Sequence, residues 1–199
     1  MAGDTKALSG LAADVRRLRS GEKQIYEQVR DCFKLSASDY DSKSKHTRQF
    51  YAQLQDKFLY AILGMTAAEI IIDRADGGKA LMGLTSTKSG APTLADAKVG
   101  KNYLMTDELY ALHILCEQFL LFVESRAVQG KEMTMEGLAE KFDQLLEVQG
   151  HPVFQGYKNY LRATAEDHAR RELQTYQQRS RIEGTAKEKK KKRTIKKSS

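Results

Sequence analysis

The sequence predicts an all-α fold of five to six helices, with a long ordered inter-helical loop at about residues 76–105 and a disordered basic tail. Apolar residues recur at intervals of three and four along most of the chain, which is the period of an amphipathic helix. No segment of useful length alternates with the two-residue period of a strand. Only two prolines occur in the 199 residues, so long helices can run unbroken. A chain of this length can bury a core of its own.

The first expected helix spans about residues 5–35 and carries a narrow apolar stripe. Gly21 weakens the middle of this helix by about 1 kcal/mol relative to alanine. A stripe this narrow is typical of a coiled-coil seam, or of a long helix packed on its own domain. We therefore treat residues 1–35 as a separate element, a coiled-coil or docking helix. The stripe consists of Leu8, Leu11, Val15, Leu18, Ile25, Val29 and Cys32.

Residues 36–183 are expected to form one helical domain, in which polar residues mark the start of each helix. Thr66 and Glu69 have the spacing of a capping box and begin a short helix. Thr106 and Thr134 precede two further helices, where their hydroxyls can accept from backbone amides that lack helical partners. The last helix of this domain is expected to end at about residue 183.

The loop at residues 76–105 has no strong period. Loops longer than about 15 residues are uncommon in compact domains and are usually functional or disordered. Apolar residues spread through this loop predict that it is ordered and packed on a core, namely Leu81, Met82, Leu84, Val99, Tyr103 and Leu104. Polar residues gather in the same stretch and at its entry, so we expect a polar binding pocket. The candidate pocket residues are Thr66, Glu69, Arg74, Asp76, Thr85, Lys88, Lys101, Asn102 and Tyr103.

The formal net charge of +7 is confined to residues 184–199. This tail holds eight bases and one acid, whereas the rest of the chain holds 25 of each and is neutral. A basic run with no interleaved aromatic residue binds phosphates non-specifically, or is simply a solvated terminus. The bases of the tail are Lys187, Lys189, Lys190, Lys191, Lys192, Arg193, Lys196 and Lys197.

The cysteines and the hydropathy indicate a cytoplasmic protein. Cys32 and Cys116 lie far apart in apolar helical registers, and no cysteine or histidine pair has metal-ligand spacing. We therefore expect neither a disulfide nor a metal, and we expect no cofactor. No apolar run approaches the roughly 20 residues of a membrane span, so a membrane partner is not expected.

The sequence leaves open whether the protein is an enzyme. No residues have the arrangement of a Ser/His/Asp or Cys/His set, so catalytic residues cannot be assigned. A metal-dependent nuclease would need converging acids. The acids nearest the loop are Glu69, Asp73, Asp76 and Asp96.

Six blocks of the sequence carry a family resemblance. They are FYAQLQDK (50–57), TAAEII (66–71), RAD (74–76), MGLTS (82–86), KNYL (101–104) and MTME (133–136). In order and spacing these blocks resemble the C-terminal half of the RhuM virulence-protein family of bacteria, over about residues 11–178. The MGLTS and KNYL blocks are the most specific part of the resemblance.

The resemblance implies a bacterial gene carried on genomic islands and other mobile elements, and it implies no established activity. Full-length family members have a further N-terminal region similar to a DNA-binding helix-turn-helix. The resemblance leaves open whether this chain is a natural short form, the product of a split gene or a fragment, and such a region on a separate chain is one of the partners we consider. Three positions depart from the family pattern. Thr87 stands where an aromatic residue is common, Tyr60 stands where a histidine is common, and a proline common near Ala80 is missing. If that histidine is catalytic in the family, this chain is impaired.

Three hypotheses follow from the sequence. The first is a binding module for DNA or RNA in a mobile-element or virulence system, with the tail giving phosphate affinity and the loop forming a pocket. The second is an enzyme that acts on phosphodiester or nucleotide substrates with the same pocket as active site. The third is a structural or oligomerising half, paired through its first helix with a second copy or with the separate N-terminal region.

Overall fold

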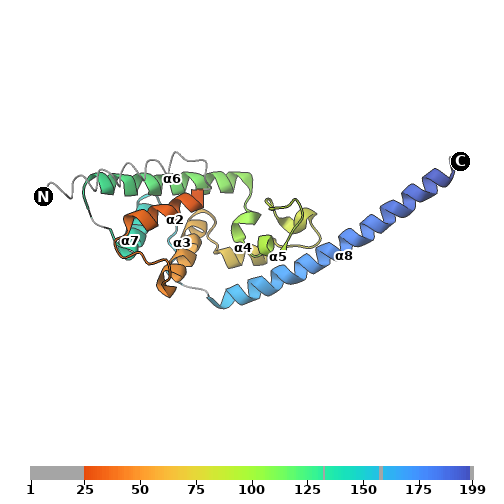
Figure 1. Cartoon of the computed structure of the whole chain (residues 1–199), viewed down its shortest axis with the longest axis horizontal. Coiled ribbons are helices and arrows are strands. Elements are labelled where there is room, and N and C mark those ends of the chain that lie inside the picture. The colour runs from red at the N-terminus through yellow and green to blue at the C-terminus, as the bar shows by residue number, and fades with distance from the viewer. Residues whose placement is uncertain (1–24, 132, 157–158, 198–199) are drawn as a thin grey trace. The chain divides into compact units, whose positions relative to one another are not determined.

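The computed structural model describes residues 25–131, 133–156 and 159–197, with the backbone alone from residue 184 onward. Within these ranges the regular structure is helical, apart from one isolated parallel bridge between Ala37 and Met133. The predicted all-α fold is therefore confirmed. The chain divides into two compact units (Figure 1). Unit 1 combines residues 1–65 and 106–157, and unit 2 combines residues 66–105 and 158–199.

The predicted segment boundaries differ from those of the two units. Residues 1–24 lie outside the described part of the chain, so only the end of the first expected helix is seen, as α2 (Ile25–Ser36). The last helix, α8 (Asn159–Lys197), keeps a helical backbone through residues 184–197, where the sequence predicts a disordered tail. Lysine, arginine, alanine and glutamate are good helix formers, which explains why this polar segment is helical.

Unit 1 contains α2, α3 (Lys45–Leu63), α6 (Thr106–Val128) and α7 (Met135–Val148). Its core is a cluster of aromatic rings contributed by all four helices. The Phe119 ring stacks on Phe33 at 5.4 Å and meets Phe142 edge-on at 5.2 Å. Phe58 lies 4.2 Å from Phe142. These four side chains are fully buried, and such aromatic pairs add about 0.5–1.5 kcal/mol each beyond their burial.

Polar contacts fix the ends of the unit 1 helices. The Met133 carbonyl accepts from the amide of Ser38 at 2.9 Å, and the Asp39 carboxylate accepts from the amide of Met135 at 2.8 Å. The Lys57 ammonium donates to Asp143 at 2.6 Å, between α3 and α7. The first two of these bonds join the turn after α2 to the start of α7, and the third joins α3 to α7. As predicted, the hydroxyl of Thr134 caps α7 by accepting from the third backbone amide of that helix.

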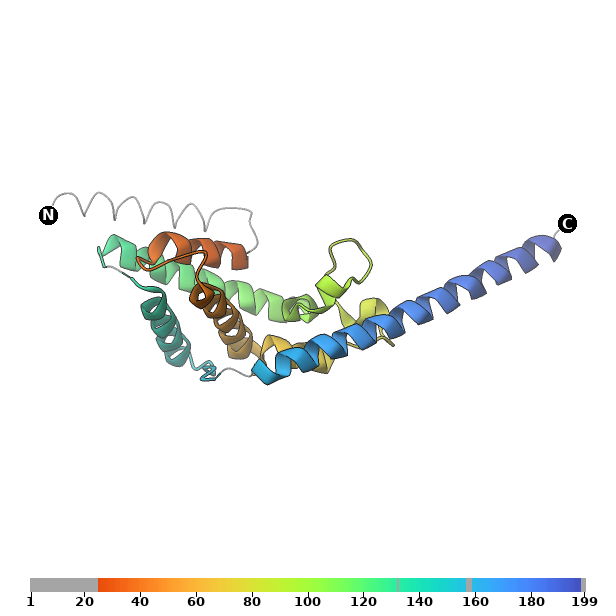
Figure 2. The ribbon, with the colours of Figure 1, turned by 60° about the horizontal axis from the view of Figure 1, so that its bottom comes forward.

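Unit 2 contains α4 (Ala67–Arg74), η1 (Ala80–Gly83), α5 (Leu94–Ala97), η2 (Gly100–Tyr103) and α8. The long loop predicted at residues 76–105 is thus ordered into three short helical elements. One face of α8 packs against α4, α5 and η1, as Figures 1 and 2 show. Its buried residues are Ala165, Ala169 and Leu173. From the loop, Met82, Leu84, Tyr103 and Leu104 complete this core, as the sequence predicts.

Replacement of Phe119 by alanine tests the aromatic core. We expect Phe119→Ala to lower the free energy of unfolding by about 3–5 kcal/mol, because a fully buried ring with three aromatic neighbours is lost. Leu121→Ala is the matched control, since Leu121 lies on the same helix but is 46% exposed. Urea denaturation followed by circular dichroism measures both. Equal losses in the two variants would contradict this description of the core.

Candidate functional site

The entry to the candidate site is the capping box that the sequence predicts at the start of α4. The Glu69 carboxylate accepts from the amide of Thr66 at 2.8 Å and from its hydroxyl at 2.9 Å. In return the Thr66 hydroxyl accepts from the amide of Glu69 at 3.4 Å. Thr66 is only 2% exposed. Both side chains therefore satisfy the first backbone amides of the helix.

Arg74 and Tyr103 join the end of α4 to η2. The Arg74 guanidinium is 17% exposed and donates to the Tyr103 carbonyl at 3.0 Å. The Tyr103 ring is fully buried, and its hydroxyl donates to the Ala97 carbonyl at 2.9 Å. Burial raises the pKa of Tyr103 far above its ordinary value, so the phenol stays protonated. It acts here as a hydrogen-bond donor to the backbone.

Asp76 shapes the turn that follows α4. Its carboxylate accepts from the amide of Gly78 at 2.7 Å, and the Lys79 ammonium lies 3.8 Å away. An aspartate that bonds the amide two residues ahead forms an Asx turn. The side chain remains 48% exposed, so it combines a local structural bond with access to solvent.

Thr85 and Asn102 tie the MGLTS block to the KNYL block. The amide and the hydroxyl of Thr85 both donate to the Asn102 carbonyl, at 2.8 and 2.9 Å. The same hydroxyl lies 2.8 Å from the Leu104 carbonyl. The Asn102 side chain donates to the Asp96 carbonyl at 3.0 Å. The two blocks that carry the family resemblance are therefore joined mainly through backbone groups.

A second capping box lies inside the loop, at Thr93 and Asp96. The Asp96 carboxylate accepts from the Thr93 hydroxyl at 2.6 Å and from the Thr93 amide at 3.2 Å. The hydroxyl bond, followed by the backbone amides of Thr93 and Lys88 and the Lys88 charge, lowers the pKa of Asp96. This second capping box could have been found from the sequence alone, because a threonine followed three residues later by an acid is the spacing of such a box.

Four side chains of α8 hold the loop, and sequence reasoning missed all of them as site residues. Glu172 accepts from the amide of Gly77 at 2.7 Å, and Arg179 donates to the Gly77 carbonyl at 3.0 Å. His168 lies 3.0 Å from the Ala75 carbonyl, and Glu166 accepts from Lys98 at 2.6 Å. The bond to Lys98 lowers the pKa of Glu166.

Helical spacing provides the signal that could have identified three of these residues. His168, Glu172 and Arg179 are separated by four and seven residues, which places them on one side of a helix. That side also carries the buried apolar stripe of α8. Polar residues in register with an apolar stripe are therefore candidates for bonding to a packed neighbour.

The backbone of η1 is strained at the MGLTS block. Leu81 and Met82 adopt left-handed conformations with φ of 48° and 52°, which cost about 1–2 kcal/mol each for residues with a side chain. Gly83 follows with φ of +85°, and a Cβ there would lie 2.3 Å from the Arg74 carbonyl oxygen. Met82 is fully buried, and its carbonyl accepts from the amide of Asp76 at 3.1 Å. Packing and hydrogen bonding together maintain this turn.

The predicted pocket residues all lie in unit 2, where most of them make separate local hydrogen bonds. Arg74, Thr85, Asn102 and Tyr103 bond backbone groups of the loop, and Thr66 and Glu69 bond each other. Lys88 lies beside Asp96. Lys101 is half-buried in η2. Asp76 lies in the turn after α4 with its side chain 48% exposed.

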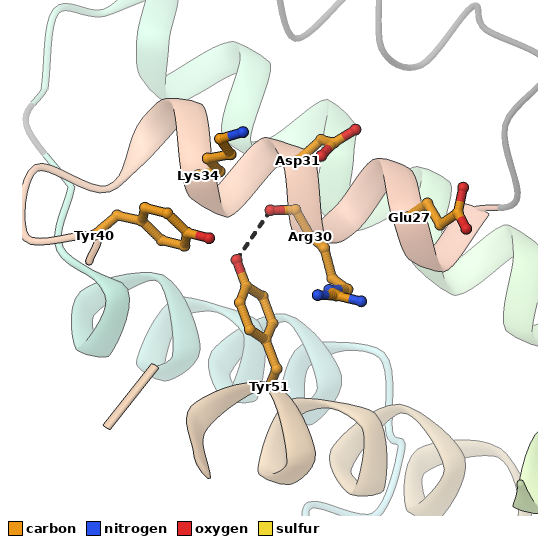
Figure 3. A pocket seen from close by; sticks show the side chains of 6 residues that line it. All are labelled: Glu27, Arg30, Asp31, Lys34, Tyr40 and Tyr51. Atoms are coloured by element: carbon orange, nitrogen blue, oxygen red, sulfur yellow. Dashed lines mark hydrogen bonds between the residues drawn. The ribbon is translucent and has the colours of Figure 1, made fainter. Parts of the chain in front are cut away.

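A hollow of about 330 Å³ lies in unit 1, and none of the predicted pocket residues lines it. Figure 3 shows its walls, which come from α2, α3 and the turn between them. The Tyr51 hydroxyl donates to the Arg30 carbonyl at 3.0 Å, and the Arg30 guanidinium lies 5.2 Å from the Tyr51 ring centre. The lining residues are Glu27, Arg30, Asp31, Lys34, Tyr40 and Tyr51. Two acids and two bases leave this surface without a net charge.

The described residues contain neither a metal-binding group of side chains nor a helix that could span a membrane. No three or more His, Cys, Asp and Glu side chains of that part of the chain are placed to hold a metal ion together. In the same ranges, no helix has both the length and the apolar character that a membrane span requires.

Replacement of Gly83 by alanine tests the close approach of the loop to α4. We expect Gly83→Ala to lower the free energy of unfolding of unit 2 by about 3 kcal/mol or more, because strain at positive φ adds to a backbone collision. Gly90→Ala is the control, since Gly90 has φ of +78° but no neighbour within 4 Å. It should cost about 1 kcal/mol. Equal effects, measured by hydrogen exchange of α4 amides, would refute the close approach.

The lowered pKa of Asp96 predicts a pH-dependent contribution to stability. Because the folded pKa lies below the unfolded value of about 3.9, the carboxylate stabilises the fold above that pH. The contribution is lost as the pH falls through the folded pKa. Asp96→Asn should therefore be less stable than the native chain at neutral pH, with a gap that shrinks below about pH 4. Thermal unfolding across this range measures the gap, with the exposed Asp167→Asn as control.

Comparison with known proteins agrees with the resemblance seen in the sequence. No curated protein and no solved structure shows significant similarity to the chain. The family model described as "Virulence protein RhuM family" matches residues 3–184, which cover most of both units and include the blocks joined by Thr85 and Asn102. The chain therefore belongs to the RhuM family of virulence proteins.

Proposed function

We propose that the chain is a nucleic-acid-binding protein whose contact surface is the basic end of α8. The observation that carries this proposal is the location of the charge. The whole excess of +7 lies in residues 184–199, on a neutral body, and the backbone of residues 184–197 is helical. A dense row of lysines on a helix presents many cations to a polyanion at once.

The contacts within unit 2 support this role because they fix one stretch of α8 to the loop. We call residues 165–179 the anchored segment, since Glu166, His168, Glu172 and Arg179 bond the loop. We call residues 180–197 the distal segment. Figures 1 and 2 show that the distal segment runs on past α4 and α5 in the direction set by the anchored segment. The loop thus supports a projecting basic helix.

The chemistry of the distal segment favours phosphates as its ligands. Lysine and arginine side chains that neutralise phosphates release condensed counterions, so affinity falls steeply with salt. The contacts carry no sequence information in themselves. The chain belongs to a virulence family, and we propose that this binding takes place in the cytoplasm, as part of a bacterial virulence or mobile-element system.

The two other hypotheses receive less support from the geometry. An enzyme acting on phosphodiesters would need several accessible acids that converge. Glu69 and Asp96 form capping boxes, which leaves Asp73 and Asp76, at 63% and 48% exposure, as the accessible acids near the loop. The oligomerisation hypothesis rests on the stripe of the first helix, and four of its residues fall within residues 1–24, outside the described part of the chain. Neither is supported by a specific contact.

Charge removal in the distal segment tests the proposal. We expect replacement of Lys189, Lys190, Lys191, Lys192 and Arg193 by glutamine to weaken binding to DNA and to reduce the slope of log K against log salt by up to about 4. Mobility-shift titrations at several salt concentrations measure the slope.

The matched control removes five exposed bases of unit 1. These are Lys34, Lys43, Lys45, Arg48 and Lys131. The two variants change the net charge equally, so any difference between them reports where the contact lies. If the control reduced the slope as much as the distal variant, or if the native chain bound no nucleic acid, the proposal would be wrong.

A further inference from the structure

Basic residues occupy successive helix positions near the end of the distal segment of α8. The five consecutive bases Lys189–Arg193 span more than one turn of an α-helix, which has 3.6 residues per turn. A helical backbone through these residues therefore places a base in every direction around the helix axis. Lys187, Lys196 and Lys197 extend the charge toward both ends of the run. By register, the positions of these bases are spread around the helix axis.

This arrangement is unsuited to two common polyanionic partners. A helix that lies on an anionic membrane needs one broad apolar face. Between residues 180 and 197 the only large apolar side chains are Ile182 and Ile195. Proteins that bind single-stranded nucleic acid stack the bases on aromatic side chains. The last aromatic residue of the chain is Tyr176, which precedes the distal segment.

Duplex nucleic acids differ in whether they admit a helix. The major groove of B-form DNA is about 12 Å wide and accepts an α-helix, with phosphates along both walls. The major groove of duplex RNA is deep and narrow and does not. A helix with basic residues at positions all around its axis has a charge complementary to a groove that has phosphates along both walls.

We propose that the distal segment of α8 binds in the major groove of duplex B-form DNA, an inference that rests on the proposed nucleic-acid binding. Its lysines contact phosphates on both walls, so binding tolerates many sequences. The anchored segment fixes the direction in which the helix leaves unit 2.

Groove binding also relieves repulsion within the helix. Lys189 and Arg193 are four residues apart, as are Lys192 and Lys196, and like charges at this spacing destabilise a helix. Phosphates on both walls neutralise these pairs. Binding to duplex DNA is therefore expected to stabilise the helix, which circular dichroism detects as increased helical signal.

The first experiment compares four ligands with the full chain at one salt concentration. They are a DNA duplex of mixed sequence, an RNA duplex of the same sequence, one DNA strand alone, and phosphatidylserine vesicles. We expect the DNA duplex to bind at least about tenfold more tightly than each of the others. Equal affinity for the nucleic acids would overturn the groove assignment but leave the proposed function intact. Tighter binding to vesicles would overturn the groove assignment, and no binding to any nucleic acid would overturn both.

The second experiment blocks the groove without changing the phosphates. In DNA whose cytosines carry glucosylated hydroxymethyl groups, sugar fills the major groove. We expect about a tenfold loss of affinity for this duplex relative to the unmodified one. Unchanged affinity would show that the chain binds the outside of the backbone, which would overturn the inference while preserving the proposed function.

A pair of substitutions at Thr194 tests whether the helix itself is required. Thr194→Pro keeps the charge but removes a backbone donor inside the helix, whereas Thr194→Ala keeps both the charge and the helix. We expect the proline variant to lose about tenfold in affinity for duplex DNA and the alanine variant to bind like the native chain. Equal binding by the two variants would contradict insertion as a helix.

Discussion

Unit 2 depends on the contact between the Gly77 backbone and the backbone of α8. A Cβ at Gly77 would lie 2.5 Å from the Glu172 carbonyl oxygen and 2.6 Å from Cβ of Thr175, so only glycine permits this approach. At that distance the Gly77 amide reaches the Glu172 carboxylate and its carbonyl reaches Arg179. Hydrogen bonds to charged groups contribute about 1.5–3 kcal/mol each. The turn after α4 is thereby fixed to the helix that carries the excess charge.

The strained turn at Leu81 and Met82 is a consequence of that attachment. Once Gly77 is fixed on α8, the chain must reverse within a few residues to bring Met82 into the core. Two left-handed residues achieve the reversal, and the bond from the Asp76 amide to the Met82 carbonyl retains it. Strain of this kind persists only where the surrounding structure determines it. Burial of Met82 and the close packing of Gly83 provide that surrounding structure.

Local features of the structure could be predicted from the sequence, whereas long-range bonds could not. The capping residues Thr66 and Thr134 and the ordered loop follow from short-range patterns. The bond from Arg74 to the Tyr103 carbonyl depends on two segments meeting in space. A cluster of polar residues in a loop resembles a pocket in sequence, but a packed loop must also satisfy its backbone groups, and several of these side chains do so. The sequence predicts a disordered tail, whereas the backbone of residues 184–197 is helical, because the helix propensity of these residues outweighs their low apolar content.

Anchoring and charge together determine the kind of binding that α8 can support. The distal segment extends about 27 Å, since a helix rises about 1.5 Å per residue. One turn of B-form DNA is about 34 Å long, so a single helix of this length engages one stretch of groove. Because the rest of the chain is neutral, the electrostatic attraction in the proposed complex comes from the bases of the tail. Contacts to phosphates carry no sequence information, so in the proposed complex an anchored helix of this kind selects the form of the nucleic acid.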